Sequence, residues 1–188
     1  MQKIILIGSS TGGPGHLQKI VSSLPSSFNA IIVIAQHMGF EYLQSFASRL
    51  NEISALSVNL AHNTTWLENT NIYICEKNCE FELADDRVKL LTQEGHNQSL
   101  YNPDINQLFS SATKLCGKYE IMAIILTGIG DDGATAMLKL SKCNATLIAE
   151  SKESAIIYGM PMRAKELVKD IDVLSLNKII HTIQEFGK

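Results

Sequence analysis

A serine lies between two glycines directly after an apolar run near the start of the chain. Ser10 is the centre of the G-x-S-x-G sequence at Gly8–Gly12, which follows the run Ile4–Ile7. In a strand-turn-helix elbow of this kind, the glycines permit backbone angles that a Cβ would disfavour and leave space around the serine hydroxyl. The same turn could cradle a phosphate, or Ser10 could cap the following helix. The motif alone therefore leaves a nucleophile, a nucleotide site and a helix cap open.

Two further kinds of side chain that could activate a serine follow other predicted strands. His37 comes after one apolar run, and Asp131 and Asp132 come after another. Because the carboxyl ends of parallel strands meet at one edge of a sheet, we expect these side chains to lie near Ser10. A hydroxyl nucleophile needs a base, and a carboxylate best orients a histidine base. The spacing therefore favours a triad of Ser10, His37 and one of the two aspartates.

Each of these residues also has an interpretation without catalysis. His37 could be a loop histidine before a helix, and Asp131 and Asp132 could cap the next helix and interact with its dipole. Spacing leaves open which of the two acids would serve the histidine. The remaining histidines are expected to have surface roles, and they are His16, His62, His96 and His181.

The glycine spacing disfavours a nucleotide cofactor. Neither G-x-G-x-x-G nor G-x-x-x-x-G-K-[ST] occurs, and the second predicted strand ends in Gln36-His37, where a dinucleotide fold has Asp or Glu to bind a ribose. Cys75 and Cys79 have a spacing near that of metal ligands, but no second pair accompanies them. We therefore expect no cofactor and no metal, and we expect all four cysteines, with Cys116 and Cys143, to be reduced thiols.

The composition is typical of one globular domain spanning residues 1–188. Hydrophobic residues make up 45% of the chain and charged residues 19%, with a formal net charge of −3. The basic residues do not cluster, which argues against binding to nucleic acid or to an anionic membrane surface. No apolar run approaches the ~18 residues of a membrane-spanning helix, and the N-terminus lacks a signal-peptide pattern, so we expect a cytoplasmic location. The sequence leaves the oligomeric state open.

Apolar runs alternate with segments of helical period, which predicts an α/β fold: a doubly wound, mainly parallel sheet with helices on both faces. Three short strands interrupt this rhythm and predict an antiparallel hairpin excursion at one edge of the sheet; they are Ile72–Cys75, Phe81–Ala84 and Val88–Leu91. The polar segment Gln93–Asn102 is expected to be the longest loop. The other strands are expected at Ile4–Ile7, Ala30–Ala35, Ala55–Leu60, Met122–Leu126, Thr146–Ala149 and Asp172–Leu174, and helices around Leu17–Leu24, Tyr42–Leu50, Ile105–Ala112, Met137–Leu140 and Ile179–Phe186.

Four separated motifs, taken in order, resemble the catalytic domain of the CheB family of chemotaxis protein-glutamate methylesterases. They are Ile7–Gly13, Gln36-His37-Met38, Leu126–Ala134 and Tyr158-Gly159-Met160-Pro161. The resemblance covers nearly the whole chain and is far more specific than the serine elbow alone. It implies a triad of Ser10, His37 and Asp132, because the family's aspartate is the one that precedes Gly133.

The resemblance also implies an activity and a partner. The substrates would be glutamate methyl esters on the cytoplasmic helices of methyl-accepting chemotaxis receptors, with deamidation of receptor glutamines in some cases. Ser10 would attack the ester, His37 would carry its proton to departing methanol, and Asp132 would orient His37. The turns suggest that backbone N–H groups near Thr11 and Ile129 hold the oxyanion. A serine hydrolase of other small esters and a non-catalytic receptor-binding module remain as alternatives.

The chain departs from the family's pattern in three places. Only two residues separate Met1 from the first predicted strand, so we expect no N-terminal receiver domain, and we expect small phosphodonors to leave the rate of demethylation unchanged. Tyr101-Asn102 stands where the family usually has a His-Arg pair, so we expect substrate docking to differ. Glu76-Lys77 replaces the usual Pro-Gly hairpin, a change that we expect to be structural only.

Overall fold

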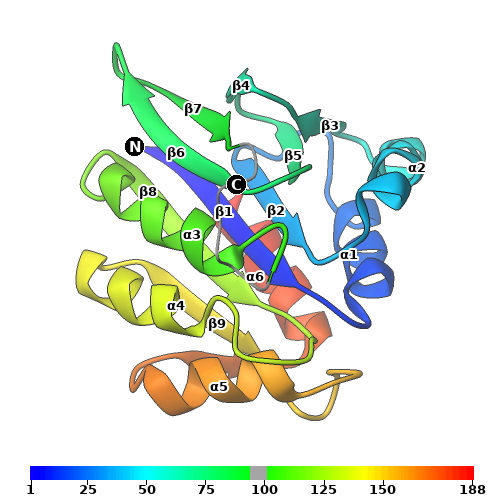
Figure 1. Cartoon of the computed structure of the whole chain (residues 1–188), viewed down its shortest axis with the longest axis vertical. Coiled ribbons are helices and arrows are strands. Elements are labelled where there is room, and N and C mark those ends of the chain that lie inside the picture. Colours follow the sequence, from blue (N-terminus) through cyan, green and yellow to red (C-terminus); the bar gives the residue numbers. More distant parts are fainter. Residues whose placement is uncertain (94–100) are drawn as a thin grey trace.

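The computed structural model describes residues 1–93 and 101–188 and is built on a parallel sheet of seven strands. The order across this sheet is β10-β9-β8-β1-β2-β5-β3, and every pairing within it is parallel (Figure 1). Three antiparallel strands form a second sheet in the order β4-β7-β6. The strands are β1 (Gln2–Ser9), β2 (Ile31–Gln36), β3 (Ser57–Ala61), β4 (Thr64–Trp66), β5 (Asn71–Cys75), β6 (Cys79–Ala84), β7 (Arg87–Thr92), β8 (Tyr119–Ile125), β9 (Thr146–Glu150) and β10 (Asp172–Leu174). The α-helices are α1 (Gly13–Ser22), α2 (Phe40–Ile53), α3 (Ile105–Ser111), α4 (Ala134–Leu140), α5 (Gly159–Leu167) and α6 (Leu176–Phe186), with 3₁₀ turns η1 (Ala112–Leu115) and η2 (Ser141–Cys143).

Both faces of the large sheet are covered. Along β1 the side chains alternate: Ile4 and Leu6 enter one hydrophobic core, while Ile5 and Ile7 enter the other. The first core includes side chains of α3, α4, α5 and the small sheet, and the second includes side chains of α1, α2 and α6. A strand buried on both faces needs apolar residues at every position, which explains the continuous runs in the sequence. The predicted doubly wound α/β class is confirmed.

The course of the chain across the sheet reverses between β1 and β8. From β1 the chain enters α1 on one face, and from β8 it enters α4 on the other, so the two following loops separate at the carboxyl edge. In open α/β sheets such a position forms the crevice in which ligands bind. Ser10 directly follows β1, and the segment 126–133 follows β8.

The middle of the chain corrects one part of the predicted topology. The antiparallel excursion is confirmed for β6 and β7, which Asp85 and Asp86 connect with positive φ angles of 51° and 59°. It also contains β4, which was not predicted. The prediction was wrong for Ile72–Cys75, because β5 lies between β2 and β3 in the large sheet and is parallel to both. The sequence of a short buried strand does not indicate which strand will lie next to it in the sheet. Most of the predicted loop Gln93–Asn102, residues 94–100, lies outside the described residues.

The cysteines also differ in part from the prediction. Cys116 and Cys143 form a disulfide with their Cα atoms 5.7 Å apart, so the expectation of four reduced thiols was wrong for this pair. They meet because each precedes the start of one of two adjacent parallel strands, β8 and β9. Cys75 and Cys79 are buried free thiols. The hydrogen bond between them raises the pKa of Cys75, which burial raises further, and lowers the pKa of Cys79.

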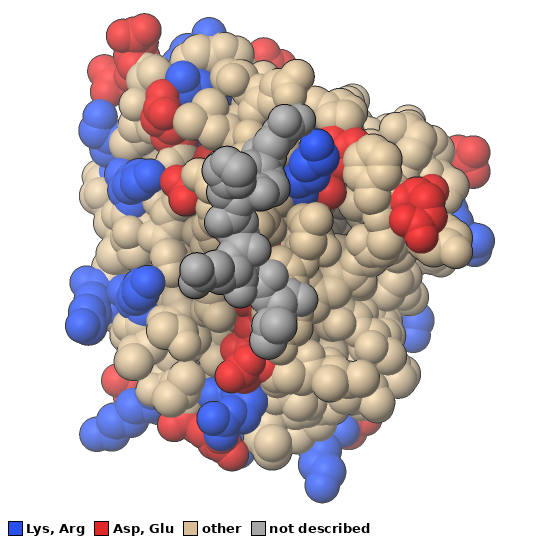
Figure 2. Space-filling model, in the orientation of Figure 1, with Lys and Arg blue, Asp and Glu red and all other residues tan. Residues whose placement is uncertain are grey.

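Charged side chains of both signs are interspersed on the surface. On the face drawn in Figure 2, Lys and Arg side chains stand among Asp and Glu side chains, mostly toward the periphery. In the described part of the chain, no helix has the length and apolar character needed to cross a membrane. Residues 1–93 and 101–188 also hold no group of three or more His, Cys, Asp or Glu side chains that could bind a metal ion.

Candidate active site

Ser10 lies where the backbone turns sharply out of β1. Its N–H donates to the Thr127 carbonyl at 3.0 Å, and its carbonyl accepts from the Gly13 N–H at 2.9 Å. Gly12, at φ 88°, is the residue before α1, and no side chain caps that helix. Ser10 is therefore not a helix cap, and the turn leaves its half-buried side chain at the carboxyl edge of the sheet. The close approach of Gly128 needs a glycine, since a Cβ there would lie 2.7 Å from the Ser10 Cβ.

A buried glutamine holds the serine turn and the histidine together. Gln36 is the last residue of β2 and is paired in register with Ser9 of β1, so Ser10 and His37 are the next residues of adjacent parallel strands. The Gln36 side-chain amide donates to the carbonyls of Ser10 at 3.0 Å and His37 at 2.9 Å, and its oxygen accepts from the Ser9 hydroxyl at 2.6 Å. The His37 N–H also donates to the Ser9 carbonyl at 2.9 Å. Gln36 thus fixes the backbone at both Ser10 and His37.

His37 and Asp132 are brought into contact by the loops after β2 and β8. Nε2 of His37 lies 2.8 Å from Oδ2 of Asp132, and the aspartate is 1% exposed. Asp131, by contrast, is exposed. Neither acid caps α4, because Gly133 occupies that position with φ 89° and no side-chain cap is present. Nδ1 is thus left as the ring nitrogen that could accept a proton from a neighbouring hydroxyl.

The start of α3 supplies two more donors to the aspartate. The N–H of Ile105 donates to Oδ2 of Asp132 at 2.8 Å, and that of Asn106 donates to Oδ1 at 2.9 Å. Asp104 caps the helix by accepting from the Gln107 N–H at 2.8 Å. These bonds fix the direction of the carboxylate. The sequence gives no clear signal for such backbone donors, and α3 was predicted only as a core helix.

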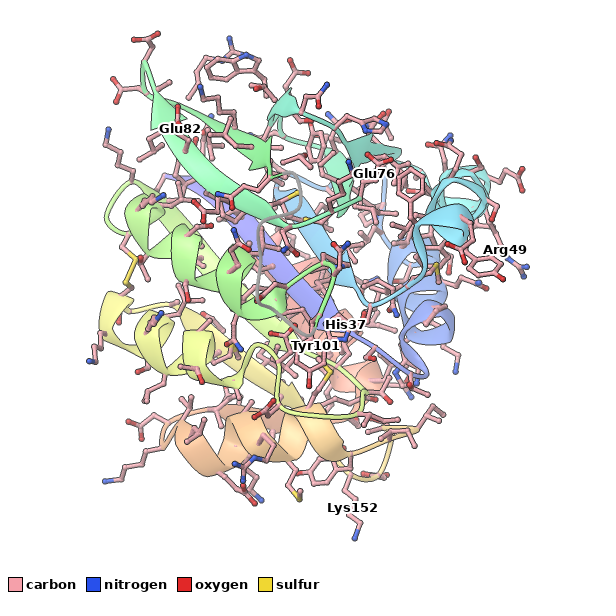
Figure 3. All side chains as sticks on the ribbon, in the orientation of Figure 1. His37, Arg49, Glu76, Glu82, Tyr101 and Lys152 are labelled. Carbon is pink, nitrogen blue, oxygen red and sulfur yellow. A yellow bond between two sulfur atoms is a disulfide. The ribbon has the colours of Figure 1, made fainter. Side chains whose placement is uncertain are left out.

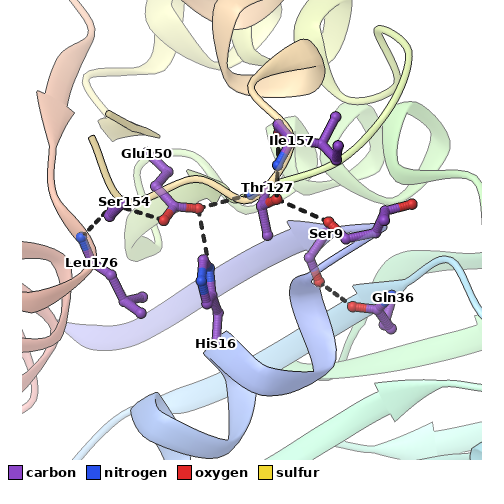
Figure 4. Close-up of polar contacts among 9 residues, drawn as sticks. Ser9, His16, Gln36, Thr127, Glu150, Ser154, Ile157 and Leu176 are labelled. Carbon is purple, nitrogen blue, oxygen red and sulfur yellow. Dashed lines mark hydrogen bonds and ion pairs between the residues drawn. The ribbon is translucent and has the colours of Figure 1, made fainter. Parts of the chain in front are cut away.

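A second buried network ties together the loops after β1, β8 and β9 (Figure 4). The Thr127 hydroxyl accepts a hydrogen bond from the Ile157 N–H at 2.9 Å and donates one to the Thr11 carbonyl at 2.8 Å. The Thr127 N–H donates to the fully buried Glu150 carboxylate at 2.9 Å. The hydroxyl of Ser154 donates to the same carboxylate at 2.7 Å. The loops after β1, β8 and β9 are thus cross-linked through Thr127 and Glu150.

His16 departs from its predicted surface role. It is 5% exposed, and its Nδ1 lies 3.2 Å from the Glu150 carboxylate, an ion-pair distance without hydrogen-bond geometry. The prediction failed because α1 turns this position toward β9 rather than toward solvent. His62 forms an ion pair with Glu76, and His181 is exposed. His96 lies outside the described residues.

The two N–H groups that we expected to face an oxyanion lie in the loops after β1 and β8. Within residues 1–93 and 101–188, neither the Thr11 N–H nor the Ile129 N–H donates a hydrogen bond. The Ser10 N–H is already used by the Thr127 carbonyl. The Ile129 side chain is 62% exposed. Two amide donors therefore remain available to a substrate oxygen at this edge of the sheet.

Comparison with known proteins relates this geometry to a family. A family model described as CheB methylesterase matches residues 5–183. The protein-glutamate methylesterase/protein-glutamine glutaminase 2 of Carboxydothermus hydrogenoformans is 36% identical over 188 residues, which cover 98% of this chain and 53% of that protein. The protein-glutamate methylesterase/protein-glutamine glutaminase of Bacillus subtilis is 39% identical over 167 residues, 87% of this chain and 46% of that protein.

A solved structure extends the likeness to three dimensions. The crystal structure of the Thermotoga maritima CheB methylesterase catalytic domain matches with a TM-score of 0.90 at 31% identity, and the match covers 98% of both chains. The chain spans about half the length of the curated relatives it matches.

Proposed function

The chain belongs to the CheB methylesterase family, and we propose that it hydrolyses glutamate methyl esters on the cytoplasmic domains of methyl-accepting chemotaxis receptors. The observation that carries the proposal is the 2.8 Å contact between His37 and the buried Asp132, at the edge of the sheet where Ser10 follows the first strand. The names of the relatives support the ester and amide substrates. We assign the reaction to the cytoplasm, where the proposed receptor segments lie.

In the proposed acylation, Oγ of Ser10 attacks the carbonyl carbon of the ester. Its proton passes to Nδ1 of His37, because Nε2 is engaged by Asp132. The tetrahedral adduct collapses by breaking the bond to the methoxy group, which takes the proton from the imidazolium and leaves as methanol. The glutamyl group then remains as an ester on Ser10. Asp132 keeps the ring proton on Nε2 and stabilises the imidazolium.

Deacylation repeats these roles with water as the nucleophile. His37 removes a proton from water, and the hydroxide adds to the acyl carbon. The proton then returns to Ser10 as the glutamate side chain of the receptor is released in its unesterified form. A receptor glutamine would follow the same course with ammonia as the leaving group, which gives the deamidation that the relatives' names include. We propose that the Thr11 and Ile129 N–H groups stabilise the oxyanion in both steps, an interaction that acts where charge develops.

The experiment that tests the proposed function is methanol release from methylated receptor membranes by the purified chain. We expect release by the unaltered chain and none above background by Ser10→Ala, since the loss of a triad nucleophile costs on the order of 10⁶ in rate. Ser22→Ala, which changes an exposed serine of α1, serves as the matched control and should retain activity. Free glutamate methyl ester and an aryl ester are compared in parallel. Hydrolysis of the aryl ester without release from receptor would support the alternative of a general small-ester hydrolase.

A further inference from the structure

The labelled side chains of Tyr101 and His37 lie next to each other in Figure 3, and the phenol ring is stacked flat on the imidazole. The ring centroids are 4.8 Å apart and the planes differ by 5°. A parallel arrangement at this separation is an offset stack, which is one of the favourable geometries for two aromatic rings. The Ser-His-Asp reaction described above makes no use of this side chain.

Tyr101 is placed by elements that already belong to the site. Three residues after it, Asp104 caps α3, whose first N–H groups bind the Asp132 carboxylate. The phenol oxygen lies close to Gly130 of the loop after β8, because a Cβ built on that glycine would lie 2.6 Å from it. Gly130 has a φ of 93° and leaves this space open. The phenol therefore lies between the imidazole and the β8–α4 loop.

The stack restrains the motion that the aspartate leaves free. The bond from Nε2 to Asp132 fixes the direction of His37 within the plane of its ring, but it permits the ring to tilt about that bond. A flat aromatic surface against one face opposes the tilt and so fixes the direction of Nδ1. The π face also attracts the cation that forms when the imidazole takes a proton. Both effects favour the proton-transfer geometry over a misaligned ring.

We propose that Tyr101 is a positioning residue that holds the His37 ring in the plane required for proton exchange with Ser10. The proposal rests on the proposed function, since it assigns Tyr101 a part in the same reaction. It attributes the effect to the aromatic face and not to the hydroxyl. Phenylalanine at position 101 should therefore keep this function, whereas a non-aromatic side chain of similar size should lose it.

The test compares Tyr101→Phe, Tyr101→Leu and the control Tyr42→Leu, which changes a tyrosine of α2 that is 61% exposed. We expect Tyr101→Leu to lower kcat for methanol release by about tenfold, because a misaligned base slows chemistry more than binding. KM should change by less than about twofold, and Tyr101→Phe should restore kcat to within about twofold. Tyr42→Leu should leave both constants unchanged. Tyr101→Gln replaces the leucine variant if the latter fails to fold.

A spectroscopic measurement tests the stack without turnover. Protons above an aromatic face are shielded, so the ring C–H resonances of His37, assigned with His37→Gln, should move downfield in Tyr101→Leu and stay near their original shifts in Tyr101→Phe. Unchanged resonances in the leucine variant, full kcat in that variant, or equal loss in the phenylalanine variant would each overturn the proposal. If the unaltered chain releases no methanol while the resonances respond as expected, the proposed function fails and the stack stands.

Discussion

Replacing Asp132 by asparagine tests the site at its most constrained residue. The carboxylate is 1% exposed and accepts three hydrogen bonds, two at Oδ2 and one at Oδ1. An asparagine can keep its oxygen at the Oδ2 position, where it retains the bonds from His37 and Ile105, but its NH₂ group then faces the Asn106 N–H. The opposite orientation turns the NH₂ group toward His37 and Ile105, and it forces the ring proton onto Nδ1.

Both orientations slow the proposed reaction, by different amounts. In the first, His37 keeps the reactive tautomer but its imidazolium loses the anionic partner, and we expect turnover to fall by about 10²-fold. In the second, Nδ1 cannot accept a proton and the loss approaches about 10⁴-fold. Either arrangement leaves at least one buried donor without an acceptor, which lowers the free energy of unfolding by about 1–3 kcal/mol.

The assay is single-turnover methanol release, measured with urea unfolding of the same preparations. Asp131→Asn is the matched control, because the neighbouring acid is exposed and caps no helix. We expect Asp131→Asn to lie within about twofold of the unaltered chain in rate and within about 0.5 kcal/mol in stability. A larger loss in Asp131→Asn than in Asp132→Asn would refute the assignment of the carboxylate. Retention of rate in a folded Asp132→Asn would refute the role of the carboxylate altogether.

Three further predictions concern the supports of the site. Gly13→Ala should destabilise the chain by about 1–3 kcal/mol in urea unfolding, because its Cβ would overlap the Gln36 side chain. Gly15→Ala, with open space around its Cβ, should stabilise the chain by about 0.5–1 kcal/mol. Equal effects of the two substitutions on stability would contradict the packing argument. Glu150→Ala should lower the free energy of unfolding by about 1–3 kcal/mol for each donor left unpaired, including the Thr127 N–H. Glu150→Gln should lower it less. A larger loss of stability in Glu150→Gln than in Glu150→Ala would count against the network. Thiol titration of the unfolded chain should detect two thiols before reduction and four after it, and four before reduction would exclude the disulfide.

Much of this molecule could be predicted from local sequence patterns. Continuous apolar runs identified buried parallel strands because side chains on both faces of β1 enter a core. The rule that functional groups gather at the carboxyl ends of such strands brought Ser10, His37 and the aspartate pair to one edge. Spacing could not choose between Asp131 and Asp132, since the two differ by one residue in a loop. The motif resemblance pointed to Asp132, the residue that contacts His37 in the structure.

The remaining features depend on contacts between distant segments. The position of β5 between β2 and β3 is a choice among strand partners that a short apolar run does not record. Gln36 was noted as an unsuitable ribose ligand and as part of one motif, with no structural role assigned to it. A glutamine at the end of a buried strand must nevertheless find partners for its amide, and it finds them in Ser9 and Ser10. Glu150 similarly ends a buried strand, and that placement was an available signal of a buried polar network. The stack of Tyr101 on His37 joins segments that no local pattern connects.

The most direct test of the central claim is to identify the residue that becomes covalently modified. The purified chain is treated with phenylmethylsulfonyl fluoride, a sulfonylating reagent for activated serines, and methanol release and the site of modification by peptide mass spectrometry are followed together. We predict that modification at Ser10 rises in step with the loss of methanol release, and that His37→Gln is modified far more slowly. Loss of activity with the adduct on another residue, or undiminished methanol release by a chain fully modified at Ser10, would contradict this prediction.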